Sequence, residues 1–498
     1  MKKNVFKLMM ISGLLLTFFG CSDEFLNENP QSGFQNVNQF GEIAQQNPEI
    51  LNGFIAGVYA NMYLAGTGGT GGHDDFGHKA YDLFSDFLSS DMALSVSTYG
   101  WYRASITEMQ CTEDFTFLDN YQVWRHYYRI IRSTNLLIDT FGGDEADPEV
   151  PANRGTLGQA LAMRAHSYWY LTQYMQNDYN PSQEILPIYR SATPIGVGKS
   201  TAAEVFELIE RDLNRSIVLL EDFNRANKSQ VNKEVAQAML AYVIASQRDV
   251  SRMSEVVELC DAVISGTGAT VMTAGEITGG FNNVNTPGWI WGFDILPATG
   301  LRLISWWGQV DAFSYSYAWA GDAKAIDQNL YDAIPANDAR KAQFFPGSGY
   351  YNLMPIDKFY DASRIIGGPS GNVVADYVYM RIAEMHILKA ESLAKMGQEG
   401  QARTALRQVL DQRLPDTSYL DGLSGQALLD EIHLQTRIEF WGEGKTYLSI
   451  KRNQRSTGVR GSNHLSFVGE SIAHNDERFT FEIPELEIQS NVFINEQN

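Results

Sequence analysis

Hydrophobic positions recur at helical spacing along most of the chain. After Thr201, which with Glu204 has the spacing of a capping box, the apolar positions fall on one face of a helix. A second apolar stripe starts at Asp376 and ends before Gly397, a residue suited to close a helix. Further helices are predicted over 42–64, 118–141, 155–176, 231–247, 253–265, 399–413 and 425–442.

Several predicted helices follow one another in pairs joined by short turns. Helix 231–247 precedes helix 253–265, and helix 376–396 precedes helix 399–413. Small residues such as Ala390 recur where paired helices would cross, as in tetratricopeptide packing, although no clean repeat of about 34 residues is visible. We therefore predict a mainly α fold with a tetratricopeptide-like helix-pair scaffold.

Two stretches, 65–117 and 266–375, lack a sustained helical period. The first begins with a glycine-rich run, and the second is rich in Gly, Asn, Pro and aromatic residues. We interpret both as long loops with short strands that form a loop-rich, aromatic lobe. The predicted organisation is a single domain over 41–498, with the scaffold at about 41–64, 118–265 and 376–454.

The first residues have the pattern of a bacterial lipoprotein signal. Residues 1–20 combine a basic start with a short apolar stretch and are followed at once by Cys21. We predict cleavage before Cys21, acylation of its thiol, and a polar tether over 21–40. The alternative is a plain signal peptide with an incidental cysteine. Residues 22–24, a serine followed by two acids, resemble the signal that exports Bacteroidetes lipoproteins to the outer face of the outer membrane.

The charge of the chain disfavours some classes of partner, and its cysteine count argues against a disulfide-stabilised fold. The formal net charge of −21 disfavours nucleic acid as a partner. Anionic polysaccharides are also a poor match, unless a local basic patch overrides the average. Two cysteines besides Cys21 do not make a disulfide framework, and the sequence leaves open whether Cys111 and Cys260 pair.

Motifs typical of enzymes lack the context that their chemistry requires. The glycines of 66–71 match a dinucleotide fingerprint but follow a predicted helix, so a flexible loop is the better interpretation. A loop with two histidines and two acids (73–78) could hold a metal, but no second cluster completes it. No nucleophile elbow occurs, and we interpret the helical acids as scaffold ion pairs. We predict no catalysis, metal or cofactor. The helical acids interpreted as ion-pair partners are Glu384, Glu391, Glu439 and Glu443.

Aromatic residues of the lobe are the candidates for ligand binding. Sugar rings present apolar C–H faces that stack on flat aromatics, while their hydroxyls need polar partners. The alternative is that these aromatic residues pack the lobe onto the scaffold. Trp124, Trp169 and Trp441 lie in helical patterns and are expected in the core. The candidate ligand-binding residues are Trp101, Tyr102, Arg103, Trp306, Trp307, Tyr315, Tyr317 and Trp319, with Asp74 and Asp75 as weaker polar candidates.

Several ordered blocks of the chain resemble the SusD/RagB family. Residues 376–413 contain the pattern Arg-x-Ala-Glu from Arg381, followed by Ala-Glu and a glycine turn at Gly397. The segment from Arg437 to Arg452 resembles a late signature of the family, with departures at Thr446 and Ser449. Earlier helices and the Ile-Pro pair at 483–484 agree with the same family, so the resemblance spans most of the chain.

The resemblance implies a non-catalytic protein that captures nutrients at the cell surface. Members of the family have a mostly helical scaffold beneath a loop-rich binding lobe. They act as a lid on a SusC-like TonB-dependent outer-membrane barrel and deliver oligosaccharides or polysaccharides to it. Two alternatives stay open: the same scaffold binding peptides or another nutrient, and a secreted glycoside hydrolase.

Overall fold

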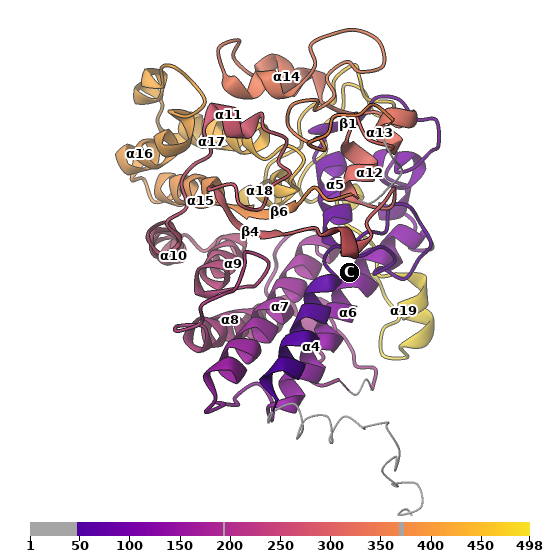
Figure 1. Cartoon of the computed structure of the whole chain (residues 1–498), viewed down its shortest axis with the longest axis vertical. Helices are drawn as coiled ribbons and strands as arrows, with labels where there is room; N and C mark the ends of the chain where they lie inside the picture. Colours follow the sequence, from indigo (N-terminus) through magenta and orange to yellow (C-terminus); the bar gives the residue numbers. More distant parts are fainter. Residues whose placement is uncertain (1–46, 193–194, 368–372) are drawn as a thin grey trace, which may run out of the picture.

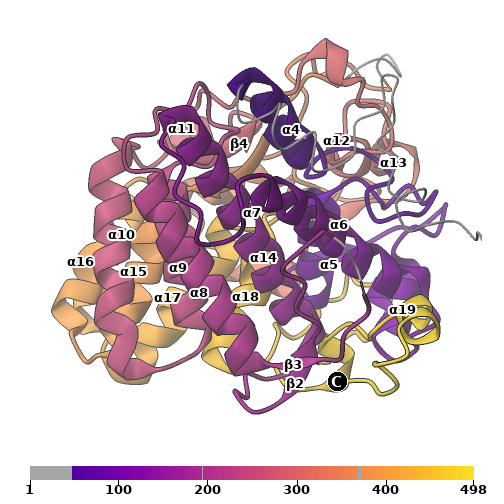
Figure 2. The ribbon, with the colours of Figure 1, turned by 90° about the horizontal axis from the view of Figure 1, so that it is seen from below.

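The longest helices pack against one another in the order in which the chain runs (Figure 1). The computed structural model describes residues 47–192, 195–367 and 373–498. The predicted signal peptide, the lipid-attachment residue Cys21 and the tether lie outside the described residues. Figure 2 shows the later scaffold helices side by side.

The scaffold is an array of neighbouring helices. Each helix from α6 to α9 contacts its successor, α10 contacts α15, and α15 contacts α16 and α17. The array confirms the prediction of a mainly helical chain built on helix pairs. The scaffold helices are α4 (Pro48–Ala60), α6 (Leu118–Thr140), α7 (Pro151–Met175), α8 (Ala202–Leu219), α9 (Lys233–Ser246), α10 (Met253–Thr267), α15 (Ile382–Lys395), α16 (Glu399–Leu410), α17 (Gly425–Glu439), α18 (Lys445–Asn453) and α19 (Glu485–Ser490).

Local chemistry explains where α8 begins and how closely it packs on α7. The predicted capping box forms, because the Thr201 side chain accepts from the Glu204 backbone N–H while the Glu204 carboxylate accepts from the Thr201 N–H. At the crossing with α7, a Cβ on Gly158 would lie 2.8 Å from Leu220 Cγ. The Ser216 hydroxyl donates to the Gly158 carbonyl over 2.7 Å. A larger residue than glycine at 158 would push the helices apart.

Short elements connect the lobe, defined here as residues 65–117 and 266–375, to the scaffold. Antiparallel pairing of β1 and β5 joins the two lobe segments, and β4 pairs with β6, which leads into α15. The lobe and connecting elements are α5 (His78–Leu88), β1 (Met92–Leu94), β2 (Glu184–Leu186), β3 (Ser200–Thr201), α11 (Ala274–Ile277), β4 (Trp289–Phe293), α12 (Trp306–Val310), α13 (Tyr317–Ala320), β5 (Lys324–Ile326), α14 (Gln328–Ala333) and β6 (Tyr377–Arg381). Single-turn helices cover Arg103–Thr107, Gln110–Thr112, Val250–Arg252, Pro297–Thr299, Ala339–Gln343, Ser418–Gly422 and Glu477–Phe479.

Two elements differ from the sequence-based expectation. The helix predicted from Asp376 begins only at Ile382, because residues 377–381 form strand β6 against β4. These residues are mostly aromatic or β-branched, which suits a strand. Helix α5 lies in a stretch interpreted as loops, and all of its residues are buried. Its apolar residues at 80, 83, 84, 87 and 88 do recur at helical spacing, so the signal was present but confined to eleven residues.

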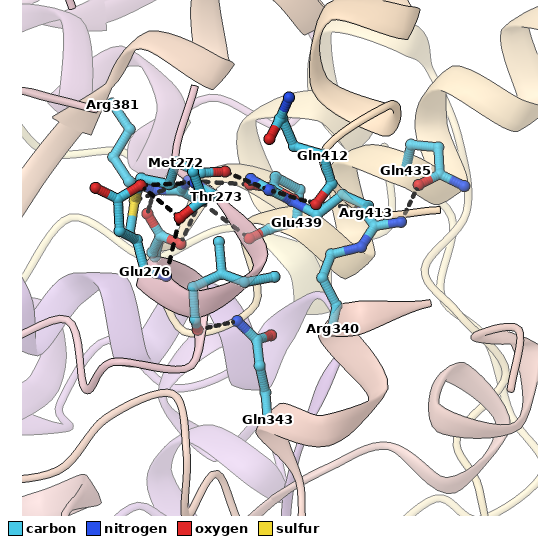
Figure 3. A network of polar contacts seen from close by, with 12 residues as sticks. Met272, Thr273, Glu276, Arg340, Gln343, Arg381, Gln412, Arg413, Gln435 and Glu439 are labelled. Carbon is cyan, nitrogen blue, oxygen red and sulfur yellow. Dashed lines mark hydrogen bonds and ion pairs between the residues drawn. The ribbon is translucent and has the colours of Figure 1, made fainter. Parts of the chain in front are cut away.

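A buried network of charges joins the lobe to the scaffold around Glu439, at the end of α17 (Figure 3). The Glu439 carboxylate contacts Arg413 (Nη2–Oε1 2.8 Å), Arg381 (Nη1–Oε1 3.0 Å) and Arg340 (Nη1–Oε2 3.4 Å). These arginines hold the pKa of Glu439 well below its usual value, against the opposing effect of burial. Arg340 comes from the lobe, so this one carboxylate ties both parts together.

The neighbouring acids of the scaffold are paired in the same way. Glu443 accepts from both Arg381 (Nε 2.8 Å, Nη2 2.9 Å) and Lys358 of the lobe (3.0 Å). Glu391 accepts two hydrogen bonds from Arg452, of 2.9 and 2.8 Å. The interpretation of the helical acids as scaffold ion pairs is confirmed.

Replacing Glu439 by Gln is expected to destabilise the protein strongly. The change leaves three buried guanidinium groups without their shared anion, for which about 3–5 kcal/mol is typical. The free energy of unfolding, measured with urea, tests this. Asp421→Asn breaks the exposed Arg407–Asp421 pair and should cost about 1 kcal/mol or less. Equal effects of the two substitutions would contradict a structural role of the network.

Candidate functional site

A group of aromatic side chains lies where the two lobe segments meet. Tyr99 and Trp101 come from the first segment, and Tyr315, Tyr317 and Trp319 come from the second, around the short helix α13. We call these five residues the aromatic patch. Tyr99 and Tyr315 are 57% and 45% exposed, and Trp101 and Trp319 are half-buried. The patch therefore combines open ring surface with residues far apart in the sequence.

Buried Asp322 positions one half of the patch against the other. Its carboxylate oxygen Oδ1 accepts from the backbone N–H groups of Thr98 (2.7 Å) and Tyr99 (2.9 Å). The Thr98 N–H also lies 3.0 Å from the Gly321 carbonyl, which continues the pairing of β1 with β5. A Cβ on Gly321 would lie 2.4 Å from Thr98 Oγ1, and its φ of +142° further disfavours other residues.

Tyr317 lies at the centre of the patch and is itself largely buried. The Trp101 ring stacks on His73, with centroids 5.2 Å apart and an interplanar angle of 4°. Tyr317 meets Trp101 and Tyr99 edge-on, at 6.0 and 5.3 Å, and its hydroxyl lies 2.5 Å from His73 Nδ1. These contacts fix the Trp101 ring in place, which lowers the entropy cost of using it as a binding surface.

The other half of the patch is held by the short helix α13. The Ser316 hydroxyl caps this helix by accepting from the Trp319 N–H over 2.9 Å. Tyr315 and Trp319 lie 5.9 Å apart at 46°. Trp319 lies so close to Gly367 that a Cβ there would be 2.8 Å from the indole ring. Trp319 therefore has one part of its ring supported and another part open.

Three predicted ligand-binding residues are buried in the core, which corrects our expectation for them. Trp306 and Trp307 are each 1% exposed, as is Tyr102. The Trp307 indole donates to the Ala375 carbonyl over 2.8 Å, and the Lys79 ammonium lies 4.3 Å from the Trp306 ring centroid. These rings fill the interior of the lobe, where Lys79 over Trp306 and Lys324 over Tyr102 join its two segments. They therefore pack structure together, as in the alternative given for the lobe aromatics, but within the lobe. Trp124, Trp169 and Trp441 are buried as expected.

The polar candidates differ in what they contact. Asp75 is fully buried and organises the glycine-rich loop by accepting from the Gly68 and Thr70 N–H groups at 2.8 and 3.0 Å. Asp74 is also buried and accepts from the Gln122 amide over 3.3 Å. Arg103 is exposed and pairs with Glu108 over 3.0 Å. Of the three, Arg103 is the side chain that a ligand could reach.

Sequence reasoning missed Tyr99 and the role of His73. Tyr99 is two residues from Trp101 and is the more exposed of the two. Its closeness to Trp101 in the sequence could have identified it as a candidate. His73 supports Trp101, and His78 is buried with its ring nitrogen 2.9 Å from the Tyr127 hydroxyl. Within 47–192, 195–367 and 373–498, no group of three or more His, Cys, Asp or Glu residues could hold a metal ion.

The structure shows whether Cys111 and Cys260 form a disulfide bond, which the sequence left open. Cys111 and Cys260 are both buried and free, so they do not form a disulfide bond with each other. Burial raises the pKa of both thiols. Among the described helices, none has the length and apolar character needed to cross a membrane.

Two family models match consecutive parts of the chain. A model described as starch-binding and associating with the outer membrane matches residues 24–244, and the SusD family model matches residues 282–485. The chain belongs to the SusD family. Members of this family are non-catalytic binding proteins, which agrees with the expectation that this chain is not an enzyme.

Solved structures share the SusD fold across nearly the whole chain. A SusD-like carbohydrate-binding protein from Bacteroides vulgatus is 22% identical, with 90% of this chain and 97% of that chain covered and a TM-score of 0.74. A SusD superfamily protein from Bacteroides thetaiotaomicron is 20% identical, with 91% and 99% covered and a TM-score of 0.73.

One of these SusD-fold structures contains a bound glycan. It is surface glycan-binding protein A of Bacteroides thetaiotaomicron in complex with laminarihexaose. That protein is 16% identical to this chain, with 90% and 99% covered and a TM-score of 0.70. No curated protein sequence matches this chain.

The buried pair Asp74 and Asp119 is expected to make the stability of this SusD-family protein depend on pH. Burial and the charge of Asp119 raise the pKa of Asp74 to about 7, from an ordinary value near 4. The folded state therefore holds a proton that the unfolded state has lost, so stability falls as the pH rises from about 4 to about 7.

Asp74→Asn is expected to reduce this pH dependence, because the amide cannot ionise. Thermal unfolding of both proteins between about pH 5 and pH 8 gives the measurement: the wild type should lose stability relative to the variant as the pH rises. The exposed Asp332→Asn should leave the dependence unchanged. Parallel curves for the wild type and Asp74→Asn would refute the assignment.

Proposed function

We propose that this SusD-family protein binds oligosaccharide or polysaccharide at the cell surface through the aromatic patch. The observation that carries the proposal is the set of partly open rings held rigidly across two lobe segments. Flat aromatic faces suit the apolar faces of sugar rings, and the exposed Arg103 nearby can pair with hydroxyl groups. The glycan-bound SusD-fold protein described above supports a sugar as ligand class.

We further propose that the bound glycan passes to a SusC-like TonB-dependent outer-membrane transporter. Support comes from the family resemblance and from the description of the first family model as associating with the outer membrane. The predicted acylation of Cys21 would hold the protein at the outer face of that membrane. A protein anchored there meets the glycan before the transporter does.

Removing the open rings is expected to weaken glycan binding. Trp101→Ala and Trp319→Ala should each raise the Kd about tenfold, since an aromatic contact and its buried area contribute roughly 1–2 kcal/mol. Isothermal titration with a panel of neutral oligosaccharides, laminarihexaose included, provides the measurement. Tyr419→Ala serves as the control, because Tyr419 is 43% exposed and lies outside the patch.

The same titrations separate the alternatives. Unchanged affinity in a variant lacking both Trp101 and Trp319 would refute the patch as the glycan site. Binding of peptides in place of every glycan would favour the peptide-binding alternative. Shortened oligosaccharides after incubation would instead indicate a glycoside hydrolase.

Acylation is expected at Cys21 and at no other cysteine. Cys21→Ser should abolish incorporation of labelled palmitate in cells, whereas Cys111→Ser and Cys260→Ser should leave it intact, since both thiols are buried. Labelling that persists in Cys21→Ser would contradict the lipoprotein assignment.

A further inference from the structure

A groove of about 590 Å³ lies on the outer side of α6, apart from the residues of the aromatic patch. Helix α19 and the segment near Tyr189 form its other walls, and Figures 1 and 2 both show α19 beside α6. Three arginines of α6 line the groove: Arg125, Arg129 and Arg132. They are four and three residues apart, so they occupy one face of the helix.

These arginines lack ion-pair partners among the residues that the structure describes. Arg125 lies over Gly69, where a Cβ would be 2.5 Å from the guanidinium, and donates to the Thr67 carbonyl over 3.4 Å. Arg129 and Arg132 are exposed. Glu487, an acid in the groove wall, accepts instead from Trp124 Nε1 (3.2 Å) and Asn491 Nδ2 (2.9 Å).

A second basic groove of the protein provides a contrast. It lies between α17 and α18 and has a volume of about 740 Å³. There Arg437 pairs with Asp91, Arg452 with Glu391 and Arg455 with Asp430. Cations in that groove are paired within the protein, whereas the row on α6 forms no ion pair with a described acid.

A row of like charges without ion pairs has a physical cost. Each like-charged pair on one helix face destabilises the helix by about 0.2–0.5 kcal/mol. Acids are plentiful in this chain, which has 59 Asp and Glu against 38 Lys and Arg, yet no described acid pairs with the row. The cost is recovered when an anionic ligand binds, because guanidinium groups form paired hydrogen bonds with carboxylates.

Aromatic rings in the same groove favour a sugar as the carrier of those carboxylates. Tyr121, Trp124, Tyr128 and Tyr189 line it together with the arginines. We propose that this groove binds a short oligouronate, with carboxylates on the arginine row and sugar faces against the tyrosines. The site provides the local basic patch that an acidic protein needs to hold an anionic glycan. It is independent of the proposed neutral-glycan site.

Titration of the purified full-length protein with tetragalacturonate tests the proposal. Binding should be measurable at about 0.05 M salt and weaker at about 0.2 M, because the contacts are ionic. A neutral galactose tetrasaccharide should not bind in the groove. Arg129→Gln and Arg132→Gln should each raise the Kd at least fivefold, since hydrogen bonds to charged groups are lost.

Arg302→Gln is the matched control, because Arg302 is exposed, forms no ion pair with a described acid and lies outside the groove. Thermal unfolding checks that each variant is folded. No binding of tetragalacturonate, or equal loss in Arg302→Gln, would overturn the proposal. Equal binding of an oligoglutamate peptide with the same arginine dependence would also overturn it, in favour of an acidic protein segment. Alanine at Trp101 should leave this binding unchanged, so the two sites can fail separately.

Discussion

Pairing of buried charges around Glu439 is the constraint on which the rest of the structure depends. Taking ions out of water costs several kcal/mol each, and only near-complete pairing offsets that cost. Glu439 and Glu443 receive cations from β6, from the turn after α16 and from the lobe. The lobe can therefore dock in one orientation, the one that brings Arg340 and Lys358 to these carboxylates. The position of the lobe in turn determines where the aromatic patch lies.

Within the lobe, position is transmitted through short connections. The three-residue pairing of β1 with β5 aligns the two lobe segments, and Asp322 carries that alignment to Tyr99. Trp306 and Trp307 are buried inside the lobe, where they contact Lys79 and Ala375. The lobe aromatics thus divide into two groups: some fill its interior, and others remain open at its surface.

The sequence predicted the features that depend on local pattern. Helix α8 and its capping box were visible because one face of the helix is polar, and the scaffold acids were correctly read as ion pairs. Helix α5 was missed although its apolar residues have helical spacing, because the run is short and follows a glycine-rich loop. Trp306 could not be distinguished from Trp319, because the difference lies in contacts with the distant Lys79 and Gly367. The spacing of the α6 arginines is visible in the sequence, but the groove that they line depends on α19 and Tyr189, which are distant in the sequence.

The hydrogen bonds from Thr98 and Tyr99 to Asp322 link two segments that are separated by more than two hundred residues. Opening this junction would break these hydrogen bonds, so it has a free energy of opening of its own. A ligand that contacts both Trp101 and Trp319 binds only the closed junction and therefore adds its binding free energy to that opening cost. Under the proposed function, glycan binding and stabilisation of the closed junction are therefore one thermodynamic event.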